Sequence, residues 1–409
     1  MSQSEVMKNS VLNIGTLGHI DHGKTSLTRA ITSVWTDRHS ESIKRNMTIK
    51  LGYADAIIKK CEGCPTPEAY TTADRCEGCS GKPEPLMRIS LLDAPGHETL
   101  MATAIAGSSV IDGILFVIAA NEPCPMQQTK EHLMIINILG IKNVLIIQTK
   151  IDIVGKEAAI AHQKQIREFV KGSIIEDAPI IPVMPNMRIN VDAVLERIAS
   201  MKLPERDMES DPLMYVVRSF DVNKPGMDAW NITGGVIGCA MVRGRLKAGS
   251  RIEIRPGLKG MAKSSRKDTY EPIVTIAKDM SNGSDMIEEG RPGGLLGIST
   301  EIDPTFTKAD ALVGSVVGLE GKLPPTVESI KLRYVKMKRD DVQDIGMQEN
   351  EPLILGIGTA TVVGSIRKVR KDVVDIDLKR PISLDKSVKI AVMRNIGKRW
   401  RLTGYGKAS

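Results

Sequence analysis

Hydrophobic and polar positions alternate with two different periods along the first half of the chain. Apolar runs of strand length occupy residues 11–17, 88–93, 114–119, 143–148 and 178–183. Between these runs apolar residues return every three or four positions, as at Leu27, Ala30 and Ile31, which is the period of an amphipathic helix. Because strand and helix patterns follow one another in turn, we expect a doubly wound, mostly parallel sheet over residues 1–203.

The pattern changes after Leu203. Helical periodicity fades, and short β-branched runs separated by glycines fill the rest of the chain, with a break at Pro324 and Pro325. Runs of this kind are typical of small antiparallel barrels. We therefore expect the α/β domain to be followed by two β-barrels, over residues 204–324 and 325–409.

Composition narrows the class of protein. The chain of 409 residues is 42% hydrophobic and 26% charged, which is typical of a globular protein with several domains. No apolar run reaches the roughly 18 residues of a membrane span, and the N-terminus lacks the apolar stretch of a secretion signal. We expect a cytoplasmic protein with no membrane partner. The net charge of +7, spread over the chain, supports nucleic-acid binding only weakly.

Residues 18–25 (GHIDHGKT) fit the phosphate-binding pattern G-x-x-x-x-G-K-[ST] and lie between an apolar strand and an amphipathic helix. In such a loop, backbone N–H groups surround the β-phosphate next to the positive end of the helix. Lys24 would bridge the β- and γ-phosphates, and the hydroxyl of Thr25 would bind Mg²⁺. A plain glycine turn is the alternative, but the order of strand, loop and helix favours the phosphate site.

Asp93 ends the next clear strand and begins the pattern D-x-x-G-H, which includes Gly96 and His97. A carboxylate at the end of a parallel strand would reach Mg²⁺ through a water molecule. The N–H of Gly96 would bond the γ-phosphate only while that phosphate is present, which makes this loop a switch. His97 would lie beside the γ-phosphate and orient the attacking water, although a histidine at a random position is usually structural.

Residues 149–152 (TKID) follow another apolar strand. Asp152 would accept hydrogen bonds from N1–H and the N2 amine of guanine, and adenine offers neither donor. Because an unpaired buried charge is costly, this carboxylate would select GTP over ATP. The stem of Lys150 would lie along the base, and Thr149 stands where asparagine is more common.

Thr48 lies between the first helix and a strand expected over residues 49–59. Its hydroxyl would complete the coordination of Mg²⁺ when a triphosphate is bound. An exposed threonine before a strand is the alternative.

The cysteines suggest a metal site. Four of the six follow the pattern C-x₂-C-x₁₁-C-x₂-C, at Cys61, Cys64, Cys76 and Cys79. Each C-x-x-C turn directs two thiolates at one ion, and two turns complete a tetrahedral site for structural Zn²⁺ within residues 61–79. A disulfide pair and an iron–sulfur cluster are the alternatives. Cys124 and Cys239 stand alone and are expected in the core.

Longer strings give the chain a family resemblance. They include residues 18–26 (GHIDHGKTS), 34–41 (VWTDRHSE), 51–55 (LGYAD), 93–98 (DAPGHE), 119–125 (AANEPCP), 218–226 (RSFDVNKPG) and 399–406 (RWRLTGYG). Together with the cysteine insertion, they resemble the γ-subunit family of translation initiation factor 2 over essentially the whole chain. Elongation-factor-like GTPases share the phosphate loop and D-A-P-G-H, but lack W-T-D-x-H-S-E and the cysteines.

The resemblance implies a P-loop GTPase domain and two β-barrels that form the core of an αβγ heterotrimer. In its GTP form such a factor carries initiator methionyl-tRNA to the small ribosomal subunit, and it releases the tRNA after GTP is hydrolysed to GDP. The implied partners are therefore the α and β subunits, this tRNA and the small subunit.

The resemblance also implies a set of site residues. GTP and Mg²⁺ would be bound by Asp21, His22, Gly23, Lys24, Thr25, Ser26, Thr48 and Gly96, with Asp21 and Asn46 also touching a metal ion. Guanine would be read by Thr149, Lys150 and Asp152, with the backbone of Val183 and Met184. Tyr53 would lie near the aminoacylated end of the tRNA.

Three departures from the family pattern bear on nucleotide binding. Asn46 replaces the glycine of R-G-x-T, and Thr149 replaces the asparagine of N-K-x-D. Residues 183–185 (VMP) replace Ser-Ala-Leu, whose backbone meets guanine O6, and Pro185 has no N–H to donate. We therefore expect nucleotide affinity to be weaker than the family norm.

Other functions are possible on the same scaffold. One is an elongation-type carrier of ordinary or selenocysteinyl tRNA, and another is a sulfate-activating GTPase subunit, which would leave the cysteine insertion unexplained. Basic stretches at residues 259–267 and 394–401 are candidates for contact with RNA phosphates, with solvated loops and strands as the alternative.

Overall fold

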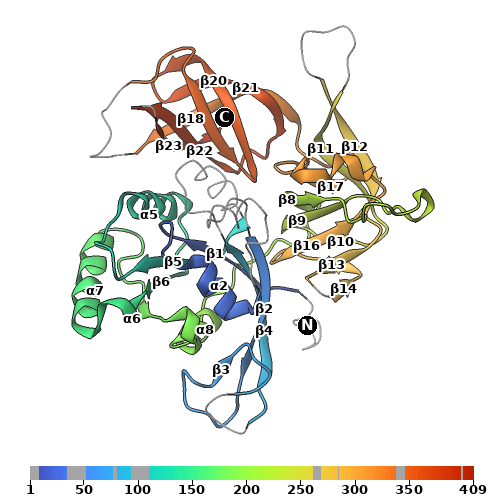
Figure 1. Ribbon diagram of the computed structural model, residues 1–409. Helices are drawn as coiled ribbons and strands as arrows, with labels where there is room; N and C mark the ends of the chain where they lie inside the picture. The colour runs from blue at the N-terminus through green and yellow to red at the C-terminus, as the bar shows by residue number, and fades with distance from the viewer. Residues whose placement is uncertain are drawn as a thin grey trace. The chain divides into compact units, whose positions relative to one another are not determined.

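A computed structural model describes residues 9–34, 52–76, 81–93, 110–260, 269–283, 285–337, 346–397 and 399–409 (Figure 1). The chain forms two compact units that meet in sequence between Glu205 and Arg206. Within the described residues, no helix is both long enough and apolar enough to cross a membrane.

The first unit is built on a seven-stranded sheet with the order β3-β2-β4-β1-β5-β6-β7. Its strands are β1 (Leu12–Leu17), β2 (Gly52–Lys60), β3 (Tyr70–Thr71), β4 (Glu84–Asp93), β5 (Gly113–Ala119), β6 (Val144–Thr149) and β7 (Ile180–Pro182). Five neighbouring strands, β4, β1, β5, β6 and β7, are parallel to one another. β2 pairs in antiparallel fashion with both β4 and β3. Every residue of β1, β5 and β6 is buried, as expected for strands covered on both faces.

Helices cover both faces of this sheet. They are α2 (Lys24–Thr32), α5 (Gln127–Leu139), α6 (Ile151–Val154), α7 (Lys156–Val170), the 3₁₀ turn η3 (Pro185–Met187) and α8 (Val191–Ala199). One core cluster joins α2 and α8 to the sheet and contains Leu27 and Leu115. A second cluster joins α5 and α7 to it and contains Phe116 and Ile166. Because Leu115 and Phe116 are consecutive residues of β5, the two clusters lie on opposite faces, and the doubly wound prediction is confirmed.

The second unit begins with a β-rich region whose main sheet has the order β12-β11-β17-β8-β9-β16-β13-β14. Its strands are β8 (Leu213–Phe220), β9 (Val236–Arg243), β11 (Arg251–Gly260), β12 (Thr269–Ile276), β13 (Met280–Asn282), β14 (Asp285–Ile287), β16 (Leu295–Ser299) and β17 (Val316–Leu319). A separate short pair is formed by β10 (Leu246–Lys247) and β15 (Glu289–Gly290). The region also contains the 3₁₀ turns η4 (Ala229–Asn231), η5 (Pro304–Phe306) and η6 (Lys308–Asp310). Among the residues described, no pairing joins β12 to β14, so the first β-rich region differs here from a closed barrel.

The second β-rich region is a closed barrel with the order β18-β21-β20-β19-β22-β23. Its strands are β18 (Thr326–Lys336), β19 (Pro352–Ile357), β20 (Ala360–Arg370), β21 (Val373–Ser383), β22 (Lys389–Ile396) and β23 (Arg399–Ala408). Pairing of β18 with β23 completes the ring. The barrel encloses an aliphatic core that includes Leu332, Leu355 and Ile390, as the short β-branched runs predict.

Contacts within the second unit join its two β-rich regions. The Thr359 hydroxyl donates to the Val216 carbonyl at 2.9 Å, and Arg243 forms a salt bridge with Asp385 at 2.9 Å. At Gly358 the backbone has a φ of 59°, and a Cβ atom would stand 2.7 Å from the Tyr215 ring. This close approach requires glycine, because any side chain would push the two regions apart.

Candidate functional site

The loop between β1 and α2 has the backbone of a phosphate-binding loop. Asp21 adopts a left-handed conformation with a φ of 59°, and Gly23 caps α2 with a φ of 90°. At Gly18, a Cβ atom would lie 2.2 Å from the carbonyl oxygen of Val117, so only glycine fits against β5. The strand, loop and helix predicted from the sequence are therefore present, and no side chain caps the N-terminus of α2, where a helix favours an anion.

Lys24 is the first residue of α2 and is almost completely buried. Its ammonium group donates to the carbonyl oxygens of Gly18 at 3.0 Å and His19 at 2.7 Å. Burial lowers the pKa of Lys24 to about 8, although Asp93 and Asp21 act in the opposite direction. A buried cation held on two loop carbonyls is well placed to bind phosphate oxygens, which are stronger acceptors.

Asp93 links the end of β4 to the phosphate-binding helix. One carboxylate oxygen accepts from the Thr25 hydroxyl at 2.7 Å, and the other accepts from the Thr16 hydroxyl at 2.9 Å. The carboxylate is completely buried. A hydroxyl and a carboxylate side by side are oxygen donors of the kind that Mg²⁺ prefers, so the residues present fit this ion.

The side chain of His22 is turned into the protein. Its ring nitrogens lie 3.2 Å from the carbonyl oxygen of Val117 and 3.1 Å from a carboxylate oxygen of Glu122. Burial lowers the pKa of His22 to about 4, so the ring is neutral at physiological pH. The ring therefore holds the loop in place, and the backbone N–H of His22, its remaining donor for a phosphate, lies 3.4 Å from the His19 carbonyl oxygen.

Thr149 ties the end of β6 to the same loop. Its hydroxyl donates to the carbonyl oxygen of His22 at 2.6 Å, and the side chain is buried. Lys150 follows in a left-handed conformation with a φ of 57°, and Asp152 lies exposed on α6. The parallel order of β1, β5 and β6 thus brings the residues of the TKID motif to the sheet edge that carries the phosphate loop.

The segment after β7 supplies few free backbone donors. The N–H of Val183 donates to the Gln148 carbonyl at 2.8 Å, and the N–H of Met184 donates to the Ile189 carbonyl at 3.2 Å. Pro185 has no N–H. None of residues 183–185, which the sequence assigns to the O6 side of guanine, therefore has a backbone N–H that is free for the base.

Arg188 fastens this segment to α2. Its guanidinium donates to the carbonyl oxygen of Ala30 at 2.7 Å, near the C-terminal end of the helix that begins with Lys24. Arg188 itself has a left-handed φ of 56°. Neither this contact nor the Thr16 contact with Asp93 has a sequence signal, because both depend on residues far apart in the chain.

Several predicted site residues fall outside the described part of the chain. These are Asn46, Thr48, Gly96, His97 and Cys79. Ser26 lies on α2 and is half-buried. Tyr53 is on β2, half-buried and in register with Leu92, one residue before Asp93. Tyr53 is therefore on the strand adjacent to the Asp93 strand.

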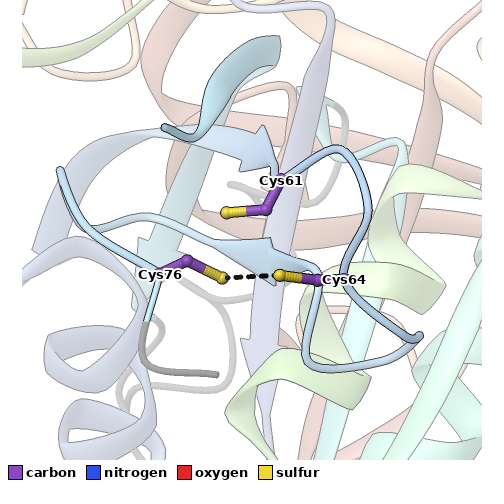
Figure 2. Close-up of side chains that lie close together, drawn as sticks. All are labelled: Cys61, Cys64 and Cys76. Atoms are coloured by element: carbon purple, nitrogen blue, oxygen red, sulfur yellow. Dashed lines mark hydrogen bonds between the residues drawn. The ribbon is translucent and has the colours of Figure 1, made fainter. Parts of the chain in front are cut away.

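Three of the predicted zinc ligands lie together between β2 and β4. The sulfur atoms of Cys61, Cys64 and Cys76 lie within 4.8 Å of one another, and those of Cys64 and Cys76 are 3.5 Å apart (Figure 2). Burial and the neighbouring Cys76 raise the pKa of the Cys61 thiol to about 11. Cys61 and Cys76 are free thiols, whereas Cys64 is disulfide-bonded. The cluster fits Zn²⁺ once its thiols are reduced, because the metal binds thiolates.

The remaining sequence candidates have mixed outcomes. Cys239 is buried on β9, as predicted, and Cys124 is half-buried against the core. Within the basic stretch 394–401, Arg394 is not a surface charge. The residue is 6% exposed, and its guanidinium donates two hydrogen bonds, at 2.6 and 2.8 Å, to the carboxylate of Glu351. Periodicity could not reveal this, because the pairing partner comes from another part of the barrel.

Two protein families match the chain. The Elongation factor Tu GTP binding domain matches residues 9–204, and the family Initiation factor eIF2 gamma, C terminal, matches residues 327–408. The first match covers the sheet with the phosphate loop, and the second covers the closed barrel.

Relatives match almost from end to end. Translation initiation factor 2 subunit gamma of Methanococcus maripaludis (strain C7) is 49% identical over 403 residues, 97% of this chain and 98% of the relative. The subunits of the same name from Methanothermobacter thermautotrophicus and Archaeoglobus fulgidus are 48% and 46% identical, over 98% and 97% of this chain and 99% and 93% of their own lengths.

Solved structures share the fold at low identity. The bacterial selenocysteine-specific elongation factor EF-Sec has a TM-score of 0.73 at 21% identity, and the match covers 98% of this chain and 58% of that one. Translation elongation factor SelB from Methanococcus maripaludis, in complex with the GTP analogue GppNHp, has a TM-score of 0.71 at 18% identity, over 98% of this chain and 79% of that one.

The phosphate loop, the Asp93 contact and the family matches agree. They make the chain a translational GTPase whose ligands are GTP, GDP and Mg²⁺. The two solved structures are elongation factors, but at 21% and 18% identity they show the fold alone, whereas the initiation factor subunits are up to 49% identical over nearly the whole chain. The chain therefore belongs to the translation initiation factor 2 gamma subunit family, whose members are the GTP-binding subunits of that factor.

Proposed function

We propose that this protein, in its GTP form, carries initiator methionyl-tRNA to the small ribosomal subunit and releases it after GTP hydrolysis. It would do so in the cytoplasm, as the core of a heterotrimer with α and β subunits. The end-to-end similarity to initiation factor γ subunits supports this over elongation-type or sulfate-activating functions. The observation that carries the switch is the 2.7 Å hydrogen bond between Thr25 and Asp93.

This bond joins the two motifs that sense the nucleotide. Thr25 belongs to the phosphate-binding helix, and Asp93 is the last residue of β4, directly before the segment that contains Gly96 and His97. In the proposed mechanism, Thr25 and Thr48 would hold Mg²⁺ with Asp93 nearby, and the ion would supply positive charge for the phosphates. Asp21 and Asn46 are further candidates for metal contact.

The remaining nucleotide contacts follow the same plan. Lys24 moves its ammonium group from the loop carbonyls to the β- and γ-phosphates, and the backbone of Gly23 and Ser26 surrounds the β-phosphate. Gly96 bonds the γ-phosphate, and His97 orients the attacking water. The loop thereby changes its order with the presence of one phosphate.

Base recognition would rest mainly on Asp152. Its exposed carboxylate accepts from the N1–H and N2 amine of guanine, with Lys150 along the base. Thr149 acts indirectly, since its hydroxyl holds the His22 carbonyl. Val183 and Met184 shape the O6 side of the pocket.

The domain division and the zinc site are part of the proposal. We place the GTPase domain at residues 1–203, with the zinc insertion at residues 61–79, and the two barrel domains at residues 204–324 and 325–409. Zn²⁺ would be held by Cys61, Cys64, Cys76 and Cys79 and would have a structural role, since four protein ligands leave no open position. Tyr53 would lie near the aminoacylated tRNA end.

A filter-binding experiment tests the function. The protein with its α and β subunits is loaded with GppNHp or GDP and mixed with initiator or elongator methionyl-tRNA. We expect retention of initiator tRNA with GppNHp, and much weaker retention with GDP or with elongator tRNA. Equal retention of both tRNAs would exclude the proposed function. Saturable GDP binding, measured in parallel on the same preparation, shows that the nucleotide site is intact.

A further inference from the structure

The loop after β5 carries an acidic residue beside the phosphate-binding loop. Glu122 lies three residues beyond the end of β5, and its side chain is 28% exposed. One of its carboxylate oxygens is 3.1 Å from the ring of His22, which belongs to the phosphate-binding loop. A carboxylate at this place would repel the phosphates of a nucleotide by charge alone. Glu122 therefore needs a role other than direct contact with the nucleotide.

Glu122 and β5 hold the His22 ring between them. Nδ1 of the ring lies 3.2 Å from the carbonyl oxygen of Val117, and Nε2 faces Glu122. A carbonyl oxygen can only accept, so Nδ1 donates to Val117 and Nε2 is the nitrogen that meets the carboxyl group. His22 is only 1% exposed, which shields both contacts from solvent. Two partners at its two nitrogens thus fix the rotation of the ring.

The carbonyl of Val117 is a shared attachment point for the loop. Besides the contact with His22, this oxygen would be 2.2 Å from a Cβ atom at Gly18, the first residue of the loop. β5 therefore touches the loop both at its start and at His22. A rotated ring would withdraw one donor from a carbonyl in the buried strand, which is unfavourable.

Direct contacts lead from Glu122 to the lysine of the loop. The rings of His22 and His19 have their centroids 5.2 Å apart. The carbonyl oxygen of His19 accepts from the ammonium group of Lys24 at 2.7 Å. Glu122, His22, His19 and Lys24 are therefore joined in series, and a change at the carboxyl group can reach the group that binds phosphate.

The backbone of the loop needs this support. Asp21, directly before His22, has a left-handed φ of 59°, which is strained for a residue other than glycine. Such a conformation persists only where neighbouring contacts hold it. Thr149 holds the carbonyl of His22 at 2.6 Å, so the backbone and the side chain of one residue are fixed from two different segments.

We propose that Glu122 is a positioning residue of the nucleotide site. Through the ring of His22 it keeps the phosphate-binding loop in the conformation that binds GTP and GDP, and it touches no group of the nucleotide itself. The inference rests on the nucleotide contacts proposed above for Lys24 and the loop backbone. Without Glu122 the loop has this conformation for only part of the time, and the apparent affinity for nucleotide falls in the same proportion.

The test is a calorimetric titration of the full-length chain with GDP and Mg²⁺. Glu122→Gln keeps the length of the side chain, and its amide can donate to Nε2, so its Kd should equal that of the parent. Glu122→Asp keeps the charge but is one methylene shorter, and Glu122→Ala removes the group. Both should bind GDP about tenfold more weakly. Asn121→Ala, at an exposed neighbour in the same loop, is the matched control and should bind like the parent.

The sign of the effect separates positioning from simple charge. Removal of a carboxylate close to phosphates should strengthen binding if charge alone matters. Weaker binding of Glu122→Ala, together with retained binding of Glu122→Gln, supports the proposal. Binding of Glu122→Ala as tight as that of the parent, or tighter, overturns it, and so does an Asp variant equal to the parent.

A double-mutant cycle tests the route through His22. In the background of His22→Ala, the further change Glu122→Ala should cause no additional loss of GDP affinity, because the carboxyl group acts through the ring. Additive losses would contradict this route. Urea denaturation of each variant identifies any loss of folding, and if Glu122→Ala does not fold, the comparison of Glu122→Gln with Glu122→Asp still decides. A parent chain without saturable GDP binding would contradict the proposed nucleotide site, and this inference with it.

Discussion

The hydroxyl of Thr149 shows how one side chain can take over a structural task. The sequence marks this residue as a departure, because asparagine is more common in its motif. In the structure the hydroxyl donates to the carbonyl oxygen of His22 at 2.6 Å, which fixes the phosphate loop to the end of β6. A threonine is long enough to make this contact, so the departure at this position does not by itself weaken the site. The occupied N–H of Met184 and the missing one of Pro185 are stronger reasons to expect weak nucleotide binding.

Substitution of Thr149 tests this role. Thr149→Val keeps the shape of the side chain but leaves the buried His22 carbonyl without its donor. We expect the free energy of unfolding to fall by about 1 to 3 kcal/mol, and the affinity for GDP to fall with it. Thr149→Ser retains the hydroxyl and serves as the control. Urea denaturation and calorimetric GDP titration of both variants decide the question, and equal behaviour of the two would show that the hydrogen bond is unimportant.

Among the elements, the insertion between β2 and β4 depends most on chemistry outside the backbone. The antiparallel pair is interrupted by more than twenty residues that contain the cysteines, and in the described part of this insertion the one strand is β3 (Tyr70–Thr71), which pairs with the end of β2. Such a segment has little apolar surface to bury, so cross-links between its cysteines supply its order. A disulfide at Cys64 and a zinc site at this cluster would exclude one another, because a sulfur atom in a disulfide is not a thiolate ligand.

Metal analysis distinguishes these states. Protein reduced and purified without oxygen should contain about one Zn²⁺ per chain, because the sulfur atoms already lie within one coordination sphere. Cys61→Ser and Cys76→Ser should lose the zinc and make the insertion more sensitive to protease, with GDP affinity unchanged. Cys124→Ser, outside the insertion, should keep the metal. If the reduced parent protein contains no more zinc than Cys61→Ser, the cysteines do not form a zinc site, and a structural disulfide is favoured.

Elements were predictable from the sequence where burial follows a period. β5 and β6 are completely buried, so their apolar runs stand out, and the phosphate loop is readable because glycine and lysine are both required at fixed spacing. Contacts between distant residues were not predictable. The Thr16 hydrogen bond to Asp93 and the Arg394 pairing with Glu351 each join segments that no local pattern relates. The basic appearance of residues 394–401 was misleading for the same reason.

At the scale of the whole molecule, the second unit depends on a narrow contact between its β-rich regions. Gly358 allows the turn before β20 to approach Tyr215, whose side chain is 5% exposed. The hydrogen bond from Thr359 and the salt bridge from Arg243 lie in the same interface. The two regions should therefore unfold together.

A matched pair of glycine substitutions tests this interface. Gly358→Ala and Gly321→Ala both place alanine at a positive φ, 59° and 74°, but only Gly358 faces a neighbour, the Tyr215 ring, at 2.7 Å. Backbone strain should cost about 1 kcal/mol in both variants. Gly358→Ala should lose a further 1 to 3 kcal/mol, roughly, through the clash. Denaturation curves measure the difference, and an equal loss in the two variants would mean that the interface does not support stability.

The hydrogen bond from Arg188 to Ala30 has a consequence for how a nucleotide is sensed. Helix α2 has 9 residues and is therefore roughly 13 Å long, with Lys24 at one end and the Arg188 contact near the other. If α2 moves as a rigid rod, a shift of its phosphate-binding end would also move the Arg188 contact and the segment on the base side. The protein would then sense the base and the phosphates together. A nucleotide with the wrong base would disturb Lys24 even though the base and this lysine are not in contact.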